Sequence, residues 1–424
     1  MWQLLNRQYG KKIYGTKSQG KTVLLLSMLA VTSVANATQE GDVKPNLDLF
    51  LACAQVNKDS ARLACYDKVS ANAGLPNFVA QKAAIDLGKT FRSTIKGNPE
   101  LVLEGEIPAY MVEDVAKESI KSHTAKQQLD NNKNLDNQIL SRFGVTQNDV
   151  EKYSPLSLAY DLDKNSEIGN FKLRAHNPMY VLPVFVHDKP NRTPNSPNHP
   201  SPKPMGDTYR SPEAKYQLSV KTKVAEDLFD TNADLWFGYT QQSHWQVYNE
   251  DNSHPFRAND YMPEIFVTQP VTAELPFNGR LRMLGAGLMH HSNGEDDPIS
   301  RSWNKMYLMA GAEWGDLTVI PRFSKRIENE KNENDDNPDI EDFYGFGDVQ
   351  VFYPLDDKNN LAGMFRISPS TGKGAVQVDY THELDNGVGI YLQLFHGYGE
   401  SIIDYNYEDT TVGVGVMLND WQGL

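Results

Sequence analysis

The sequence contains no apolar run long enough to cross a membrane as a helix. Only 39% of its 424 residues are hydrophobic, and the mean hydropathy is −0.54. A membrane-spanning helix needs ~20 consecutive, mainly apolar residues, whereas the one apolar segment, residues 23–35, is shorter. A helical membrane protein is therefore excluded.

Positive charge is also scarce, and part of it is concentrated at the N-terminus. The chain has 41 Lys and Arg against 55 Asp and Glu, a formal charge of −14. Five basic residues and no acidic ones precede the apolar segment, and Ala35, Asn36 and Ala37 end it. This order predicts a secretory signal peptide of residues 1–37; a short buried helix is the alternative. Removing these five positive charges takes the formal charge from −14 to −19, so we expect no nucleic-acid partner.

Cysteine is almost absent, with only Cys53 and Cys65 in the chain. In an exported protein this pair predicts a disulfide that closes a short loop, worth about 3 kcal/mol on the chain-entropy model. Metal binding is the alternative, although no histidine lies near the two cysteines. Residues 38–170 have a helical, polar pattern with few apolar anchors. We expect them to form a partly helical periplasmic extension.

From about residue 171 the hydrophobic pattern alternates with a period of two, which predicts strands. Twelve strands are predicted, at residues 171–188, 215–224, 233–248, 260–275, 279–292, 303–312, 316–324, 343–353, 360–367, 374–382, 387–396 and 411–420. Long polar connections at 188–212 and 325–342 contrast with tight turns such as Asn278-Gly279. An even strand number with long loops at one end is typical of bacterial outer-membrane proteins. We expect an all-β fold, a transmembrane antiparallel β-barrel of about twelve strands over residues 171–424; a soluble β-sandwich is the alternative.

The common catalytic signatures GxSxG, HExxH, repeated CxxC and GxxxxGK[ST] are missing, and candidate chemistry is concentrated in residues 289–305. On a strand, His290 and Ser292 share a face while His291 points away. Antiparallel pairing brings Asn304, at the start of the next strand, beside the end of this one. The pattern predicts a triad of nucleophile Ser292, base His290 and orienting Asn304; a loop of solvated polar residues is the alternative.

Several stretches resemble the outer membrane phospholipase A family. They are HHSNG with the following DP and SRSWN (290–304), residues 239–266, DDNPDI (335–340) and residues 397–420. The resemblance covers about residues 171–421 and implies a twelve-stranded barrel in the bacterial outer membrane, with the active site on its outer wall facing the outer leaflet. The apolar residues that share the face of His290 and Asn304 would then face lipid: Leu284, Ala286, Leu288, Met306, Leu308 and Ala310.

The activity implied by the resemblance is hydrolysis of sn-1 and sn-2 acyl esters of glycerophospholipids, and of lysophospholipids, by a serine nucleophile. The Gly294 N–H would help to hold the oxyanion. A calcium ion is the implied cofactor, bound by the Glu295 carbonyl and the Ser300 hydroxyl together with Ser253 of the partner subunit. Asp297 would belong to an alternative calcium site.

The resemblance also implies a homodimer when active and a monomer when idle. Gln241 would be the polar contact between two subunits within the membrane. A Gln241 that faces the lumen and is hydrogen-bonded inside one barrel is the alternative. A passive outer-membrane pore and a structural barrel are the rival functions.

Overall fold

A computed structural model describes residues 47–72, 84–97, 99–103, 127–146, 149–150, 152–163, 169–200, 209–228, 231–327, 335–356, 358–384 and 388–419. The predicted signal peptide lies outside these residues. None of the described helices is both long and apolar enough to cross a membrane.

The N-terminal part of the described chain is helical. Its elements are α1 (Leu47–Cys53), α2 (Asp59–Asn72), the two-residue strand β1 (Ile85–Asp86), α3 (Leu87–Ile95) and α4 (Gln127–Phe143). Val69 of α2 packs with Ile139 and Phe143 of α4 in a small apolar core. Cys53 and Cys65 form a disulfide with their Cα atoms 5.6 Å apart. Helices α1, α2 and α4 therefore share an apolar core, and the disulfide links α1 to α2.

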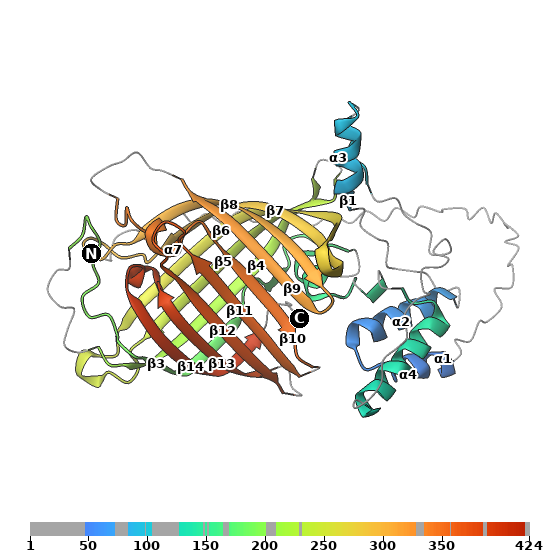
Figure 1. The fold of residues 1–424 in the computed structure, drawn as a ribbon. Helices are drawn as coiled ribbons and strands as arrows, with labels where there is room; N and C mark the ends of the chain where they lie inside the picture. The colour runs from blue at the N-terminus through green and yellow to red at the C-terminus, as the bar shows by residue number, and fades with distance from the viewer. Residues whose placement is uncertain are drawn as a thin grey trace, which may run out of the picture. The chain divides into compact units, whose positions relative to one another are not determined.

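Twelve antiparallel strands, β3 to β14, form a closed barrel (Figure 1). They are β3 (Met179–His187), β4 (Pro212–Leu228), β5 (Ala233–Trp245), β6 (Phe256–Leu275), β7 (Gly279–Ser292), β8 (Ser302–Trp314), β9 (Leu317–Arg326), β10 (Gly347–Pro354), β11 (Asn359–Ile367), β12 (Gly374–Glu383), β13 (Gly389–Tyr398) and β14 (Glu408–Asn419). Sequential strands are neighbours, and β14 pairs with β3 to close the barrel. The predicted fold class is confirmed.

The barrel is apolar outside and polar inside, the reverse of a soluble protein. On β14 the outward Val412, Val414 and Val416 are 37–46% exposed, whereas the inward Thr411 and Met417 are buried. Charged lumen residues are buried as well, among them Lys215, Lys221, Glu264 and Asp379. Because successive side chains of a strand point to opposite faces, the apolar residues lie outside and the charged residues lie inside, as an outer-membrane barrel requires.

Long loops and short turns lie at opposite ends of the barrel. The connections after β3, β5, β7, β9 and β13 are loops, and two of them contain the short helices η2 (Glu250–Asn252) and η4 (Ile402–Asp404). The connections after β6 and β8 are tight, with Asn278 at φ 61° and Gly315 at φ 62°. Positive φ suits Asn and Gly, so these residues allow the sharp reversals. The end of β7 and the start of β8 therefore meet at the long-loop end.

Two predicted strands differ from the structure. The segment 171–188 is divided into β2 (Leu173–Ala175) and β3, separated at Pro178, which has no N–H for a ladder. Part of the segment 343–353 is helical instead: α7 (Glu341–Tyr344) precedes β10. A side chain at Gly345 would place its Cβ 2.2 Å from the Ile367 carbonyl oxygen, so the chain turns there on a glycine at φ 70°.

A short helix, α6 (Pro155–Tyr160), packs among residues of the barrel interior. Ser154 caps the helix by accepting a hydrogen bond from the Ser157 N–H, and Pro155 begins it. Leu156 belongs to the same buried cluster as Trp236 and Met283 of the barrel. Although it precedes the alternating pattern, α6 thus fills lumen space.

Candidate active site

The β7–β8 hairpin pairs His290 directly with Asn304. The imidazole Nδ1 lies 2.8 Å from the Asn304 amide oxygen Oδ1. Because that oxygen can only accept, the contact places the proton of a neutral imidazole on Nδ1 and leaves Nε2 as an acceptor. His290 is therefore oriented as a general base requires.

Ser292 lies two residues after His290 on β7 and is half-buried, while His290 is exposed. Alternation places both side chains on the outer face of the strand. Within the described chain no hydrogen bond joins the Ser292 hydroxyl to His290. Hydrogen bonds between catalytic groups often tighten only when substrate binds, so the arrangement supplies a hydroxyl and a base on one face.

His291 points into the lumen and is 5% exposed. Its Nε2 lies 3.2 Å from Asp260 Oδ2, and the Trp303 indole N–H donates to its Nδ1 at 3.4 Å. The Asp260 carboxylate also accepts from the backbone N–H of Ile402 in the β13–β14 loop. The second histidine of the motif is thus part of the barrel interior.

Asn293 closes the loop between the two strands. Its side-chain oxygen accepts from the Arg301 N–H at 2.9 Å, and its amide donates to the Ile299 carbonyl at 2.7 Å. Gly294 follows at φ 68°, and a Cβ there would lie 2.9 Å from Cε2 of Tyr261. A glycine therefore lets the backbone approach Tyr261 next to the half-buried Ser292.

Below this loop, Arg301 is fully buried and donates to the carbonyls of Pro298 and Ser300. Burial lowers the pKa of Arg301, while nearby Tyr405 and Asp336 oppose this shift. An arginine side chain is effectively always protonated in proteins, so the guanidinium is a positive charge beneath the loop. Arg301 thus supports the loop from inside through two of its carbonyl oxygens.

The structure adds Asp336, to which sequence reasoning assigned no role, to the predicted calcium loop. The Ser300 hydroxyl donates to Asp336 Oδ2 at 2.8 Å, and the Ser302 hydroxyl lies 3.2 Å from the same oxygen. The side-chain oxygen of the neighbouring Asn337 accepts a hydrogen bond from the Ser302 N–H at 2.9 Å, which holds the Asp336 segment against the start of β8. Both residues belong to DDNPDI, so the resemblance pointed to the segment but not to this contact.

Asp336 also belongs to a group of potential metal ligands with His199 and Asp297. His199 Nε2 lies 3.3 Å from Asp336 Oδ1 and 3.6 Å from Asp297 Oδ1. Glu295 is exposed in the same loop. The carboxylates of Asp297 and Asp336 and the nearby Ser300 hydroxyl are oxygen donors of the kind that calcium prefers, whereas the His199 nitrogen is not. The oxygen donors of the group therefore fit this ion.

The two residues predicted to act across the dimer lie on β5 and in the β5–β6 loop. Ser253 is exposed in the β5–β6 loop, at the C-terminus of η2, with φ 58°. Gln241 lies on β5 between Tyr239 and Ser243, whose hydroxyls are 3.1 and 3.3 Å from its amide atoms. Phe237 on the same face is 44% exposed, whereas Trp236 on the opposite face is buried. Gln241 thus faces outward, which disfavours the lumen alternative.

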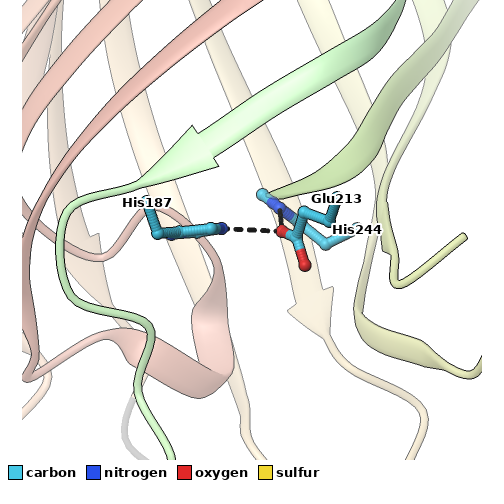
Figure 2. A group of neighbouring side chains, drawn as sticks. All are labelled: His187, Glu213 and His244. Carbon is cyan, nitrogen blue, oxygen red and sulfur yellow. Dashed lines mark hydrogen bonds and ion pairs between the residues drawn. The ribbon is translucent and has the colours of Figure 1, made fainter. Parts of the chain in front are cut away.

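A second cluster, His187, Glu213 and His244, lies inside the barrel (Figure 2). Glu213 Oε1 accepts from His187 Nε2 at 2.7 Å and from His244 Nδ1 at 2.8 Å. Arg257 Nε donates to Glu213 Oε2 at 3.0 Å, and Asp409 lies 2.6 Å from the other nitrogen of His187. The Glu213 carboxylate thus has the Arg257 guanidinium and two imidazoles as partners. The cluster is a buried network of charged and polar groups that links β3, β4 and β5.

Fold and site together define an outer-membrane barrel that carries a histidine, an asparagine and a serine on the outer face of its wall. The family model described as Phospholipase A1 matches residues 156–418, and the chain belongs to this family. It is therefore an outer-membrane phospholipase, an ester hydrolase.

Three relatives illustrate the similarity. A putative phospholipase A1 of Neisseria meningitidis serogroup B is 44% identical over 386 residues, which cover 88% of this chain and 92% of the relative. The crystal structure of a Salmonella typhi outer membrane phospholipase dimer with bound calcium is 31% identical, with a TM-score of 0.55, covering 63% of this chain and 97% of that one. An Escherichia coli outer membrane phospholipase A structure, an active-site mutant with asparagine replaced by alanine, is 30% identical, with the same TM-score and coverage.

Proposed function

We propose that the chain is a calcium-dependent, serine-type phospholipase A that hydrolyses sn-1 and sn-2 acyl esters of glycerophospholipids and lysophospholipids. The observation that carries this proposal is the 2.8 Å contact between His290 and Asn304 on the outer wall, with Ser292 on the same strand face. A hydroxyl, an oriented base and its amide partner are the groups that acyl transfer requires.

In the proposed reaction the Ser292 oxygen attacks the acyl carbonyl carbon, and its proton passes to His290 Nε2. Asn304 holds the imidazole in the productive tautomer, with less stabilisation of the imidazolium than a carboxylate would give. The Gly294 N–H donates to the developing oxyanion. Collapse of the tetrahedral intermediate releases the lysophospholipid, which takes the proton from His290. A water molecule, deprotonated by His290, then hydrolyses the acyl-enzyme.

Calcium is proposed to bind at the loop between β7 and β8. Ser300, the Glu295 carbonyl and Ser253 of the partner subunit would hold it, with Asp297 in an alternative site and Asp336 as a nearby carboxylate. When bound, calcium would supply positive charge near the developing oxyanion. Support comes from the Ser300–Asp336 contact and from the calcium that the Salmonella typhi dimer holds.

Dimerisation is proposed as the switch between idle monomer and active homodimer. A two-fold axis at the outer wall would bring two copies of Gln241 together, and each amide would then satisfy the other within lipid. The outward position of Gln241 and the dimeric Salmonella typhi structure support this assignment. The exposed Ser253 would then reach the calcium loop of the other subunit.

The orientation proposed for the membrane follows from the loops. Outer-membrane barrels have short turns on the periplasmic side and longer loops outside. The site, at the long-loop end, would face the outer leaflet. The N-terminal helices α1 to α4 would lie in the periplasm, whereas α6, which was expected there, packs inside the barrel. A passive pore is disfavoured because α6 and the Glu213 network occupy the lumen.

The test of the proposed function compares phospholipid hydrolysis by the refolded protein with calcium and with a chelator. We expect release of fatty acid with calcium and a rate near background with chelator. Asp336→Asn should raise the calcium concentration for half-maximal rate by roughly tenfold, since a charged partner is worth about 1.5 kcal/mol or more. Asp342→Asn, at an exposed position in α7, is the control. Equal rates with calcium and chelator would contradict calcium dependence.

Asn304→Ala is expected to lower kcat roughly fivefold, a smaller loss than removal of either reacting group. The substitution removes one hydrogen bond to His290 Nδ1, which is worth about 1 kcal/mol. Steady-state hydrolysis of a soluble ester would measure the loss, and Asn304→Asp should recover part of it because a carboxylate also accepts from Nδ1–H. An unchanged rate in Asn304→Ala would show that Asn304 does not orient the base.

A further inference from the structure

One imidazole and two carboxylates meet where three loops converge at the long-loop end of the barrel. His199 belongs to the loop after β3, Asp297 to the loop after β7 and Asp336 to the loop after β9. The possible ligand atoms of the three side chains all lie within 4.8 Å of one another. Segments that are far apart in the sequence thus bring a nitrogen donor and two oxygen donors to one point.

The spacing of these atoms suits a small tetrahedral ion. His199 Nε2 lies 3.3 Å from Asp336 Oδ1 and 3.6 Å from Asp297 Oδ1. Zinc binds nitrogen and oxygen at ~2.0–2.2 Å, so two ligand atoms of a tetrahedral zinc ion are about 3.3–3.6 Å apart. Both measured separations fall within this range.

The His199 imidazole is oriented toward a ligand that protein groups do not supply. Its Nε2 atom is buried, and no residue in the described part of the chain forms a hydrogen bond with it. Buried polar atoms without a partner are uncommon in native proteins, and an unmodelled ion is one of their ordinary explanations. A metal ion between Nε2 and the two carboxylate oxygens would be that partner.

The fold positions the ligands before any ion binds. Ser196 and His199 exchange backbone hydrogen bonds at 3.0 and 3.2 Å, which closes a tight turn. The Asn198 side chain donates to the Asp335 carbonyl at 2.8 Å and so ties this turn to the residue before Asp336. Two serine hydroxyls donate to Asp336 Oδ2, which leaves Oδ1 to face the imidazole. Such support of the ligands is typical of metal sites.

We propose that His199, Asp297 and Asp336 bind a divalent ion of the zinc class, which links the three loops. Zinc accepts imidazole nitrogen together with carboxylate oxygen, whereas calcium takes oxygen ligands. Two carboxylates and a neutral imidazole also balance the charge of a divalent ion. Three protein ligands leave the fourth tetrahedral position to water. Asp297 is shared with the proposed alternative calcium site, and the His199 nitrogen is what selects zinc over calcium.

Binding of cobalt(II), a coloured substitute for zinc, tests the site in the refolded full chain, freed of calcium and held in detergent micelles. A tetrahedral cobalt ion absorbs visible light far more strongly than the octahedral ion in water. We expect the protein to give this strong absorption with cobalt and to lose it when an equal amount of zinc is added. His199→Ala should weaken cobalt binding about 100-fold, because loss of even a group behind a ligand costs roughly 10- to 100-fold.

His396→Ala is the matched control. His396 is an exposed imidazole whose Nε2 lies 3.8 Å from Glu408, so it forms a surface pair of histidine and carboxylate outside the proposed site. This variant should bind cobalt as the wild-type protein does. If His199→Ala does not fold, judged by its heat-dependent gel mobility, Asp297→Asn at an exposed position decides, with an expected loss of roughly tenfold.

Three results would overturn the proposal. They are a wild-type protein that shows only the weak absorption of octahedral cobalt, equal cobalt affinity in the wild-type protein and the deciding variant, and displacement of cobalt by calcium at the concentration at which zinc displaces it. The last result would mean that the ion has only oxygen ligands. Because the measurement is of binding and not of hydrolysis, its outcome is independent of the proposed phospholipase mechanism.

Discussion

Ser292→Ala is expected to lower phospholipid hydrolysis roughly 10⁴- to 10⁶-fold while the barrel still folds. Without the hydroxyl no acyl-enzyme can form. Removal of one reacting residue of a triad lowers kcat about as much as removal of the whole triad, which gives this magnitude. Ser292 is half-buried at the last position of β7 and the described chain contains no hydrogen bond from its hydroxyl, so the loss of one oxygen should cost little folding free energy. Fatty-acid release under saturating calcium would measure the rate.

Ser370→Ala is the matched control for this variant. Ser370 lies in the loop after β11, and its hydroxyl contacts that of Ser368. It should retain the full rate. A Ser292→Ala protein that folds and keeps more than a small fraction of activity would exclude Ser292 as the nucleophile. Acylation of the wild-type protein at Ser292, detected by mass spectrometry of a quenched reaction, would identify the intermediate directly.

The barrel could be predicted from the sequence because its environment imposes a strict alternation. Lipid requires apolar residues outward and the lumen tolerates charge, so Val412, Val414 and Val416 alternate with residues of the interior. The alternation locates strands but does not show where a strand breaks. The interruption at Pro178 and the turn of α7 into β10 at Gly345 depend on local backbone contacts that periodicity does not contain.

The part of the site within one hairpin could also be predicted. His290 and Asn304 are 14 residues apart, and antiparallel register is enough to place them opposite each other. Asp336 lies 36 residues from Ser300, at the far end of another long loop, and His199 belongs to a third. Neither Asp336 nor His199 lies on a strand, so the alternating pattern of the sequence does not fix the position of either side chain. Their convergence depends on the barrel, which brings the ends of distant strands to one rim.

His290→Ala and His291→Ala are expected to behave in opposite ways although the two residues are adjacent. His290 lies on the outer face with Nδ1 held by Asn304, so its removal takes away the base and should lower kcat roughly 10⁴-fold or more. His291 is buried in the lumen against Asp260 and Trp303. Its removal should leave kcat within roughly tenfold of wild type, because it lies on the other face of the strand and contacts no reacting group.

The cost of His291→Ala should appear in stability instead. The substitution leaves Asp260 and the Trp303 indole without their imidazole partner inside the barrel, which costs about 1–3 kcal/mol. A lower denaturant midpoint for His291→Ala, together with a wild-type midpoint for His290→Ala, would separate a structural histidine from a catalytic one. The reverse pattern, with activity lost in His291→Ala and retained in His290→Ala, would mean that the strand is shifted by one residue, which would exchange its two faces.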